Sequence, residues 1–139
     1  EGDLRLGVKS GGRYPIPVGD VQIRIDTNPA WTISSSETPL DYVPESMLSN
    51  MQAYAKNLPD KNQKLVEATY KASMETAARA MSPFTATTGE KAKTILKEMI
   101  SGQKIKYRTI GLNQASSTTG EYELGPSLKE ALSKCGVPL

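Results

Sequence analysis

The alternation of hydrophobic and polar residues predicts a β-hairpin near the start of the chain. Segment 21–26 places Val21, Ile23 and Ile25 on one side and polar residues on the other, as in a half-buried strand. Asn28-Pro29 marks a turn, and segment 30–34 resumes the strand pattern. Before this hairpin, residues 1–19 form a loop-rich N-terminal segment. Its one expected element is a short edge strand, in which Leu4, Leu6 and Val8 alternate with charged or small residues.

Helical periodicity dominates residues 45–101. One helix is expected to begin at Pro44 and to end at Leu58-Pro59-Asp60, and a second from about Lys61 to Met81. The second helix carries a stripe of mainly small residues that permits close packing against a neighbour: Leu65, Thr69, Ala72, Thr76 and Ala80. A third helix is expected to begin at Thr87 or Thr88, where Thr87 and Glu90 match a capping box. Its apolar face holds Ala92, Ile95, Leu96, Met99 and Ile100, and Gly102 is suited to end it.

Strand patterns return after the helices. Segments 104–110 and 120–124 are expected to pair as a second hairpin, followed by a last short helix from Leu128 to Cys135. Strands, helices, strands and one helix in this order are typical of an α+β fold. The sequence therefore predicts a single α+β domain over residues 1–139, with an antiparallel sheet of two β-hairpins packed against three to four helices.

The chain of 139 residues contains no histidine and one cysteine. Nucleophile systems that need an imidazole base are therefore excluded, as are nearly all zinc hydrolase sites. Glu121 and Glu123 share a strand face and are the acids on which glycoside hydrolysis or calcium binding would rest, but two acids without further ligands favour an ordinary surface. We expect no catalytic residue, metal site or cofactor.

Net charge is +2, with −3 in residues 1–60 and +5 in residues 61–139. This imbalance is too small for a dedicated nucleic-acid binder. The basic segment from Lys91 to Arg108 is nevertheless a candidate patch for an anionic partner, with the alternative of two separate solvated faces; it holds Lys91, Lys93, Lys97, Lys104, Lys106 and Arg108.

Three further positions are candidates for binding. Arg24 and Asp26 are expected to project from the same face of the first hairpin, as a functional pair or as an ordinary surface ion pair. Trp31 is either a core residue or a ligand platform. Cys135 is expected to be a buried thiol or one half of a disulfide whose partner lies outside this chain, and it leaves the oligomeric state open.

Two patches resemble invasion-associated locus B proteins and the related type VI secretion-associated envelope proteins. They are segment 21–26 with Asn28-Pro29, and the tail with strands 104–110 and 120–124 and the closing segment from Leu128 to Gly136. The resemblance covers under half of the chain. The long helical middle and the missing N-terminal cysteine depart from that pattern. The resemblance implies an exported, non-catalytic, β-rich and virulence-associated domain that makes contacts in the envelope or with a host.

These observations favour a non-enzymatic protein-interaction domain with a protein partner, periplasmic or secreted and associated with the cell envelope. The start at Glu1 is typical of a processed or shortened chain, and no run of 18 apolar residues exists to span a membrane. One alternative is a cytoplasmic immunity or adaptor protein that sequesters a toxin or enzyme. Others are a weak binder of anionic surfaces or nucleic acid, and an enzyme that uses only acids and lysine.

Overall fold

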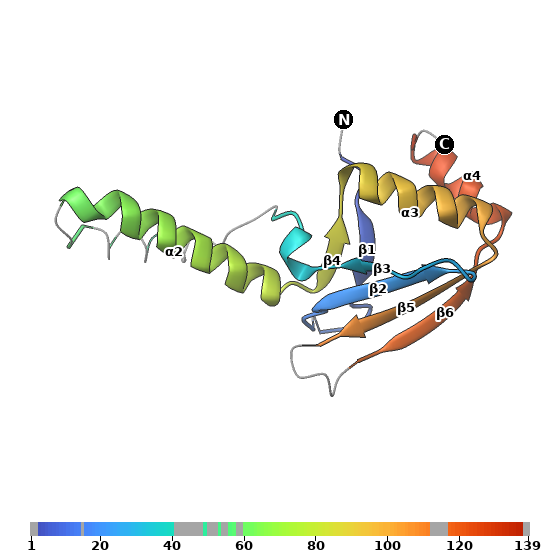
Figure 1. The fold of residues 1–139 in the computed structure, drawn as a ribbon, viewed down its shortest axis with the longest axis horizontal. Helices are drawn as coiled ribbons and strands as arrows, with labels where there is room; N and C mark the ends of the chain where they lie inside the picture. The colour runs from blue at the N-terminus through green and yellow to red at the C-terminus, as the bar shows by residue number, and fades with distance from the viewer. Residues whose placement is uncertain are drawn as a thin grey trace.

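The computed structural model describes residues 3–14, 16–40, 49, 53, 56–57, 60–111 and 117–137 (Figure 1). The strands of the described residues are β1 Leu6–Lys9, β2 Asp20–Ile25, β3 Trp31–Ile33, β4 Phe84–Thr87, β5 Lys104–Ile110 and β6 Thr119–Glu123. The helices are α2 Asp60–Ala80, α3 Gly89–Ser101 and α4 Pro126–Lys134, with a 3-10 helix, η1, at Ser35–Glu37. The prediction of an α+β fold with an antiparallel sheet is confirmed.

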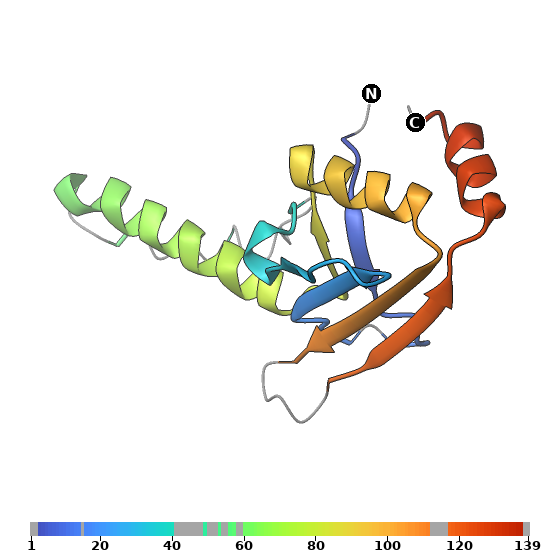
Figure 2. The ribbon, with the colours of Figure 1, turned by 45° about the vertical axis from the view of Figure 1, so that its right-hand side comes forward.

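The main sheet has four antiparallel strands in the order β3-β2-β5-β6. The central pairing joins β2 to β5 in a continuous register from Asp20↔Ile110 to Ile25↔Ile105. α3 covers one side of this sheet, here called the inner face, and the opposite side is the outer face (Figures 1 and 2). The sequence pattern found all four of these strands.

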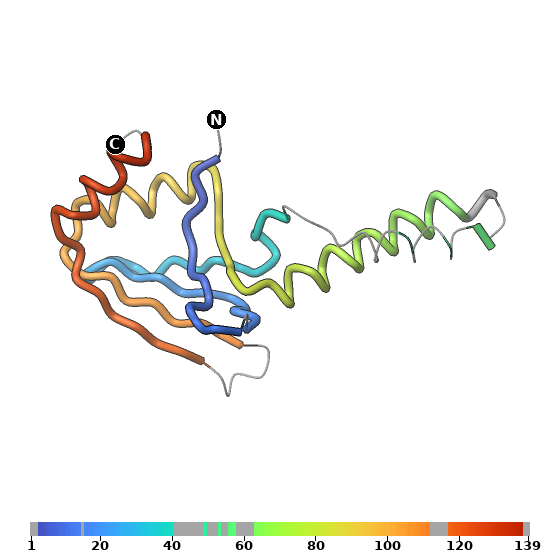
Figure 3. The backbone as a smooth tube through the Cα atoms, turned by 180° about the vertical axis from the view of Figure 1, so that it is seen from behind, coloured from blue at the N-terminus to red at the C-terminus, as the bar shows by residue number. Residues whose placement is uncertain are grey.

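β1 and β4 form a separate two-stranded sheet. The short edge strand predicted near Leu6 and Val8 is confirmed as β1, whereas β4 was not predicted. Phe84 begins β4, just after the predicted end of the second helix near Met81. Gly7 permits the close approach of the two strands, because a Cβ atom there would lie 1.9 Å from the Thr85 carbonyl oxygen. Seen from behind, β1 runs across the strands of the main sheet (Figure 3).

The hydrophobic core lies between the inner face and α3. Its fully buried members on β2 alternate along the strand as predicted, and they are Val21, Ile23 and Ile25. Ile33 of β3 and Ile95 of α3 are buried in the same cluster. Burying each such side chain stabilises the fold by roughly 1.5–3 kcal/mol. Among the helices in the described part of the chain, none combines the length and apolar character that a membrane crossing requires.

The long helix α2 begins and ends close to the predicted bounds and extends away from the sheet (Figures 1 and 3). The predicted packing stripe is mostly exposed, however, and its Leu65 is 70% exposed. The less exposed face carries the larger residues Val66, Tyr70 and Met74, which recur every four positions. The prediction that the stripe of small residues is the packing face of this helix was therefore wrong. The helix predicted from Pro44 to Leu58 falls almost entirely outside the described residues.

α3 begins at Gly89 and its predicted capping box is absent. Thr88 is the N-cap and makes no side-chain cap bond, while the Thr87 hydroxyl donates to Glu37 Oε2 at 2.9 Å instead. The Thr87 hydroxyl therefore bonds to Glu37, which is distant in the sequence, and does not cap the start of α3. The predicted end at Gly102 is confirmed, since its N–H donates to the Glu98 carbonyl.

Glu37 ties η1 to three other elements. Its carboxylate accepts from Lys91 Nζ at 2.7 Å and 2.9 Å, and the same ammonium donates to the Thr32 carbonyl of β3 at 2.6 Å. Burial acts to raise the pKa of Glu37, but hydrogen bonds from Lys91, Ser34 and Thr87 and the charge of Lys91 together lower it below its ordinary value. This network fixes the start of α3 beside β3.

We expect Glu37→Gln to lower the free energy of unfolding by about 1 kcal/mol, because it removes the ion pair while part of the carboxylate already faces solvent. The folded-state pKa lies below the ordinary value of 4.5, so the contribution is present above that pH and is lost as pH falls through the folded-state pKa. Urea unfolding at pH 7 and pH 3 measures both effects. Glu130→Gln, which removes the exposed pair with Lys134, is the matched control and should change little. Equal destabilisation at both pH values would contradict this account.

Candidate functional site

A groove of about 300 Å³ opens on the inner face of the main sheet. Residues of β1 form one wall, inward-facing side chains of β2, β5 and β6 form the floor, and Met99 contributes from α3. Its lining is largely apolar and aromatic: Leu6, Gly7, Val8, Lys9, Ile23, Met99, Ile105, Tyr107 and Tyr122. Lys9 is the one charged residue among these lining residues.

Two stacked tyrosines form the open side of the groove. The rings of Tyr107 and Tyr122 lie 6.1 Å apart with an angle of 5° between their planes. Gly120 is the register partner of Tyr107, and a Cβ atom at that position would lie 2.2 Å from the Tyr107 ring. The missing side chain at Gly120 therefore lets the Tyr107 ring lie across β6. Tyr122 is 63% exposed, so the groove ends in an accessible aromatic ring.

Hydrogen bonding to Tyr122 and burial both raise the pKa of Tyr107. The Tyr107 phenol therefore stays neutral at physiological pH and is not a general base there. The lining combines apolar carbon and two phenol groups with one charged side chain, Lys9.

A second cavity of about 230 Å³ continues the groove toward the loop after β1. The two cavities share Val8, Lys9 and Tyr107, and the second adds the exposed Ile16 and Thr118. An extended surface of this composition is suited to holding apolar side chains of a partner. Within the described residues, no group of three or more His, Cys, Asp or Glu side chains is arranged to hold a metal ion.

The outer face of the sheet is polar and carries the predicted strand cations. Lys104, Lys106 and Arg108 alternate along β5 as expected, and Arg24 of β2 is in register with Lys106. Glu121 of β6 pairs with Lys104 at 2.7 Å and with Lys106 at 2.9 Å. These hydrogen bonds hold the pKa of Glu121 below its ordinary value, and Glu121 in turn raises the pKa of Lys104. Glu121 is therefore an ion-pair partner and not a proton donor.

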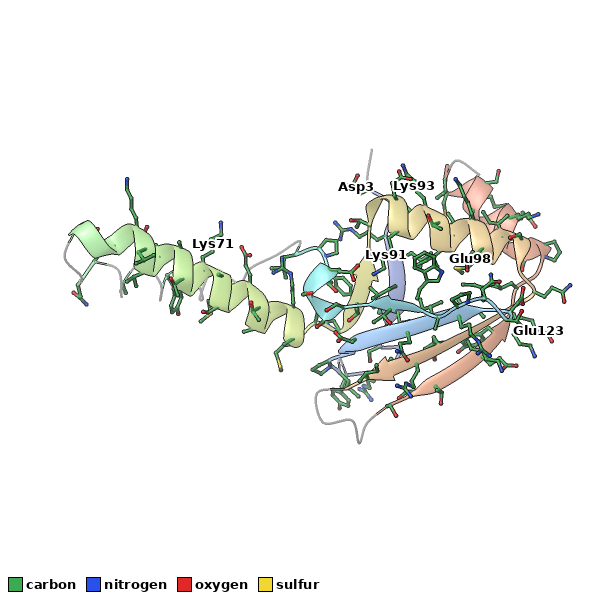
Figure 4. The ribbon with its side chains drawn as sticks, viewed as in Figure 1. Asp3, Lys71, Lys91, Lys93, Glu98 and Glu123 are labelled. Carbon is green, nitrogen blue, oxygen red and sulfur yellow. The ribbon has the colours of Figure 1, made fainter. Side chains whose placement is uncertain are left out.

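The predicted basic patch from Lys91 to Arg108 is divided between two sides of the molecule. α3 packs its apolar face on the inner side of the sheet, whereas the cations of β5 project from the outer side. Lys91 and Lys93 project from α3 (Figure 4), where Glu37 pairs with Lys91 and Glu90 with Lys93. Lys97 of the same helix is exposed. The helix lysines and the strand cations therefore form two separate faces.

The Asp26 side chain joins the first hairpin to β5. Asp26 lies beyond the end of β2, with a left-handed φ of 49°, and its carboxylate accepts from the backbone N–H groups of Gln103 and Lys104 at 2.8–3.1 Å. Arg24 and Asp26 were predicted to share a strand face on the assumption that the strand includes residue 26. However, β2 ends at Ile25. Asp26 fixes the start of β5.

Trp31 lies under α3 against the hydrophobic core. Its Nε1 donates to Glu98 Oε1 at 3.1 Å, and Asn28 donates to the other oxygen of the same carboxylate at 3.2 Å. Of the two interpretations of Trp31, this position matches the core residue.

Cys135 follows α4 and is exposed, so the expectation of a buried thiol was wrong. α4 buries no residue completely, and only Leu128 and Leu132 among its apolar side chains are half-buried. An end so lightly packed leaves the thiol in solvent.

Sequence reasoning did not assign a role to the groove. The pattern placed Leu6 and Val8 in a predicted edge strand and Met99 on the apolar face of a predicted helix, and it pointed to no role for Tyr107 or Tyr122. The available signal was the predicted pairing of strands 104–110 and 120–124, which sets two tyrosines on one side of a hairpin with a glycine between them. The wall supplied by β1 had no such signal.

Comparisons with known protein families, with curated proteins and with solved structures found no match to this chain.

We expect Gly120→Ala to displace the Tyr107 ring from β6 and to cost about 1–3 kcal/mol of stability, because the added methyl group overlaps the ring. Nuclear Overhauser contacts between the two tyrosine rings measure the displacement, and thermal unfolding measures the cost. Gly12→Ala is the control, since a Cβ atom there meets only ordinary contacts. Unchanged ring contacts in Gly120→Ala would show that Gly120 does not position Tyr107.

Proposed function

We propose that this chain is a non-enzymatic protein-interaction domain and that the groove is its docking surface. The observation that carries the proposal is the exposed Tyr122 ring, stacked on Tyr107 at the open side of an apolar groove. The proposal treats residues 1–139 as one domain in which two hairpins, packed against helices, present this groove.

The composition of the groove supports a protein partner. Tyrosine is enriched at the centres of protein interfaces because its ring buries a large apolar area and its hydroxyl keeps a polar contact. The groove is lined mainly by carbon-rich side chains and contains no carboxylate among its lining residues, which favours contact with apolar groups of a partner. An exported or envelope-associated partner fits the proposal, and so does a cytoplasmic enzyme or toxin.

We expect affinity capture with the full chain as bait to retain a partner that Tyr122→Ala no longer retains. Fractions of the source cell's envelope and cytosol supply the prey, and purified partner then gives dissociation constants. Truncating an interface tyrosine typically weakens binding by about 2 kcal/mol, or some thirtyfold.

Tyr14→Ala is the matched control for this experiment. Tyr14 is 73% exposed, comparable to Tyr122, and lies outside the residues that line the groove. Equal loss of the partner with both variants, or with neither, would rule out the groove as the docking surface.

A second candidate function is weak binding to an anionic surface through the outer face. Arg24 lies directly opposite Lys106, and neither Arg24 nor Arg108 has an ion pair within the described residues. Like charges on neighbouring strands are unfavourable unless an anion offsets them.

We expect this second function to appear as binding to vesicles of anionic lipid that weakens as salt rises, since exposed charges are screened. Arg24→Gln and Arg108→Gln should each weaken binding by roughly 1 kcal/mol, about fivefold, with Lys97→Gln as the control on the other side of the molecule. Sedimentation of vesicles at low and physiological salt measures both effects. Binding that is absent or independent of salt excludes this candidate.

A further inference from the structure

The two edges of the main sheet differ in whether a further strand could pair with them. At one edge, β3 has only three residues, and Lys91 Nζ already occupies its Thr32 carbonyl. Lys91 is held in turn by Glu37. Short strands and edge-directed lysines are devices that prevent a further strand from pairing. The β3 edge is therefore blocked.

At the other edge, β6 has five residues and no described element beyond it (Figures 1 and 2). Its pairing with β5 is continuous from Lys104↔Glu123 to Arg108↔Thr119, without a bulge. Segment 119–123 contains no proline, and its inward-facing residues Gly120 and Tyr122 carry no charge. The β6 edge lacks the proline, bulge and inward-pointing charge with which sheet edges are commonly protected.

The hydrogen-bond pattern shows which backbone groups of β6 point outward. Thr109 N–H donates to the Thr118 carbonyl, and Leu124 N–H donates to the Gln103 carbonyl. Because bonded and non-bonded pairs alternate in an antiparallel ladder, Gly120 and Tyr122 bond to β5. The N–H and C=O groups of Thr119, Glu121 and Glu123 therefore face away from the sheet and are open to a further strand.

The side chains of β6 specify what that strand carries. On the inner side, a neighbouring residue lies beside the exposed Tyr122 ring at the open side of the groove. On the outer side, it lies beside Glu121 and Glu123. Glu121 is shared by two lysines, whereas Glu123 has no ion pair within the described residues. A second copy of β6 centred on Glu121 or Tyr122 would set acid against acid, which is destabilising.

We infer that the partner docks by adding an extended strand to the β6 edge, with apolar or aromatic residues facing Tyr122 and a lysine or arginine facing Glu123. The inference rests on the proposed function and deepens it, because it states how a protein partner reaches the groove. Backbone hydrogen bonds supply affinity in this mode, and the alternating side chains supply specificity.

The test uses the full chain labelled with ¹⁵N and three synthetic peptides with blocked ends. One peptide alternates lysine with valine and phenylalanine, the second has glutamate in place of every lysine, and the third is the lysine peptide with alternate backbone amides methylated. The lysine peptide is expected to slow hydrogen exchange of the Thr119, Glu121 and Glu123 amides. The methylated peptide, whose side chains are unchanged, is expected to bind at least tenfold more weakly.

Charge reversal at Glu123 gives the second arm. Glu123→Lys should weaken the lysine peptide about three- to fivefold and favour the glutamate peptide, as expected for one exposed ion pair. Lys97→Glu on α3 is the control and should change neither affinity. Because Glu123 is the register partner of Lys104, the new lysine sets like charges opposite each other. Glu123→Gln avoids this and should also weaken the lysine peptide, and thermal unfolding checks the fold of both variants.

Three outcomes overturn the inference: no binding of the lysine peptide, equal binding of the methylated peptide, or amides at 119, 121 and 123 already protected by a dimer of the free chain. None of these outcomes removes the proposed function, which the comparison of Tyr122→Ala with Tyr14→Ala tests separately. If Tyr122→Ala retains every partner while the lysine peptide still protects the three amides, the proposed docking groove fails and strand addition stands.

Discussion

Burial of the apolar side of β2 is the interaction on which the rest of the structure depends. This strand is paired on both sides, by β3 and by β5, and its three inward residues are almost completely removed from solvent. Ile95 of α3 closes the cluster, and the Lys91–Glu37 pair holds the start of that helix beside β3. The hydrophobic contribution is non-directional. The position of the helix is set by the polar contacts at its start.

The groove lies on the inner face of the sheet, where α3 and β1 leave that face partly open. α3 and β1 lie over the inner side of β2, while the inner side of β6 carries only Gly120 and Tyr122. The core and the groove are therefore one continuous apolar surface, buried at one end and exposed at the other. Exposed apolar areas often mark interaction sites on proteins, and this is the basis for the proposed docking at the aromatic ring. The outer face of the same strands is neutralised in part by Glu121 and offers a surface of opposite chemistry.

The sequence predicted elements whose periodicity is local, and it failed where distant segments decide the outcome. The alternation in segments 21–26 and 104–110 placed β2 and β5 correctly, because a two-residue period fixes which side of a strand is buried. The capping box at Thr87 failed because Glu37, fifty residues earlier, takes the same hydroxyl. β4 was missed because its four residues show no distinct pattern and depend on Gly7 for their partner. The groove was missed for the same reason, since one wall comes from β1 while most of its floor comes from β5 and β6, about a hundred residues later.

The pairing of β2 with β5 has a consequence for how the chain is made. The central strand ends at Ile25, and its second partner begins at Lys104, after α2 and α3. During synthesis, β2 and β3 leave the ribosome before α3 and β5 have been made. The apolar side of β2 therefore stays uncovered until these later elements emerge. Contacts between such distant segments form slowly and leave unpaired strands exposed to aggregation. The sheet that presents the groove is thus completed only after β5 and β6 have emerged.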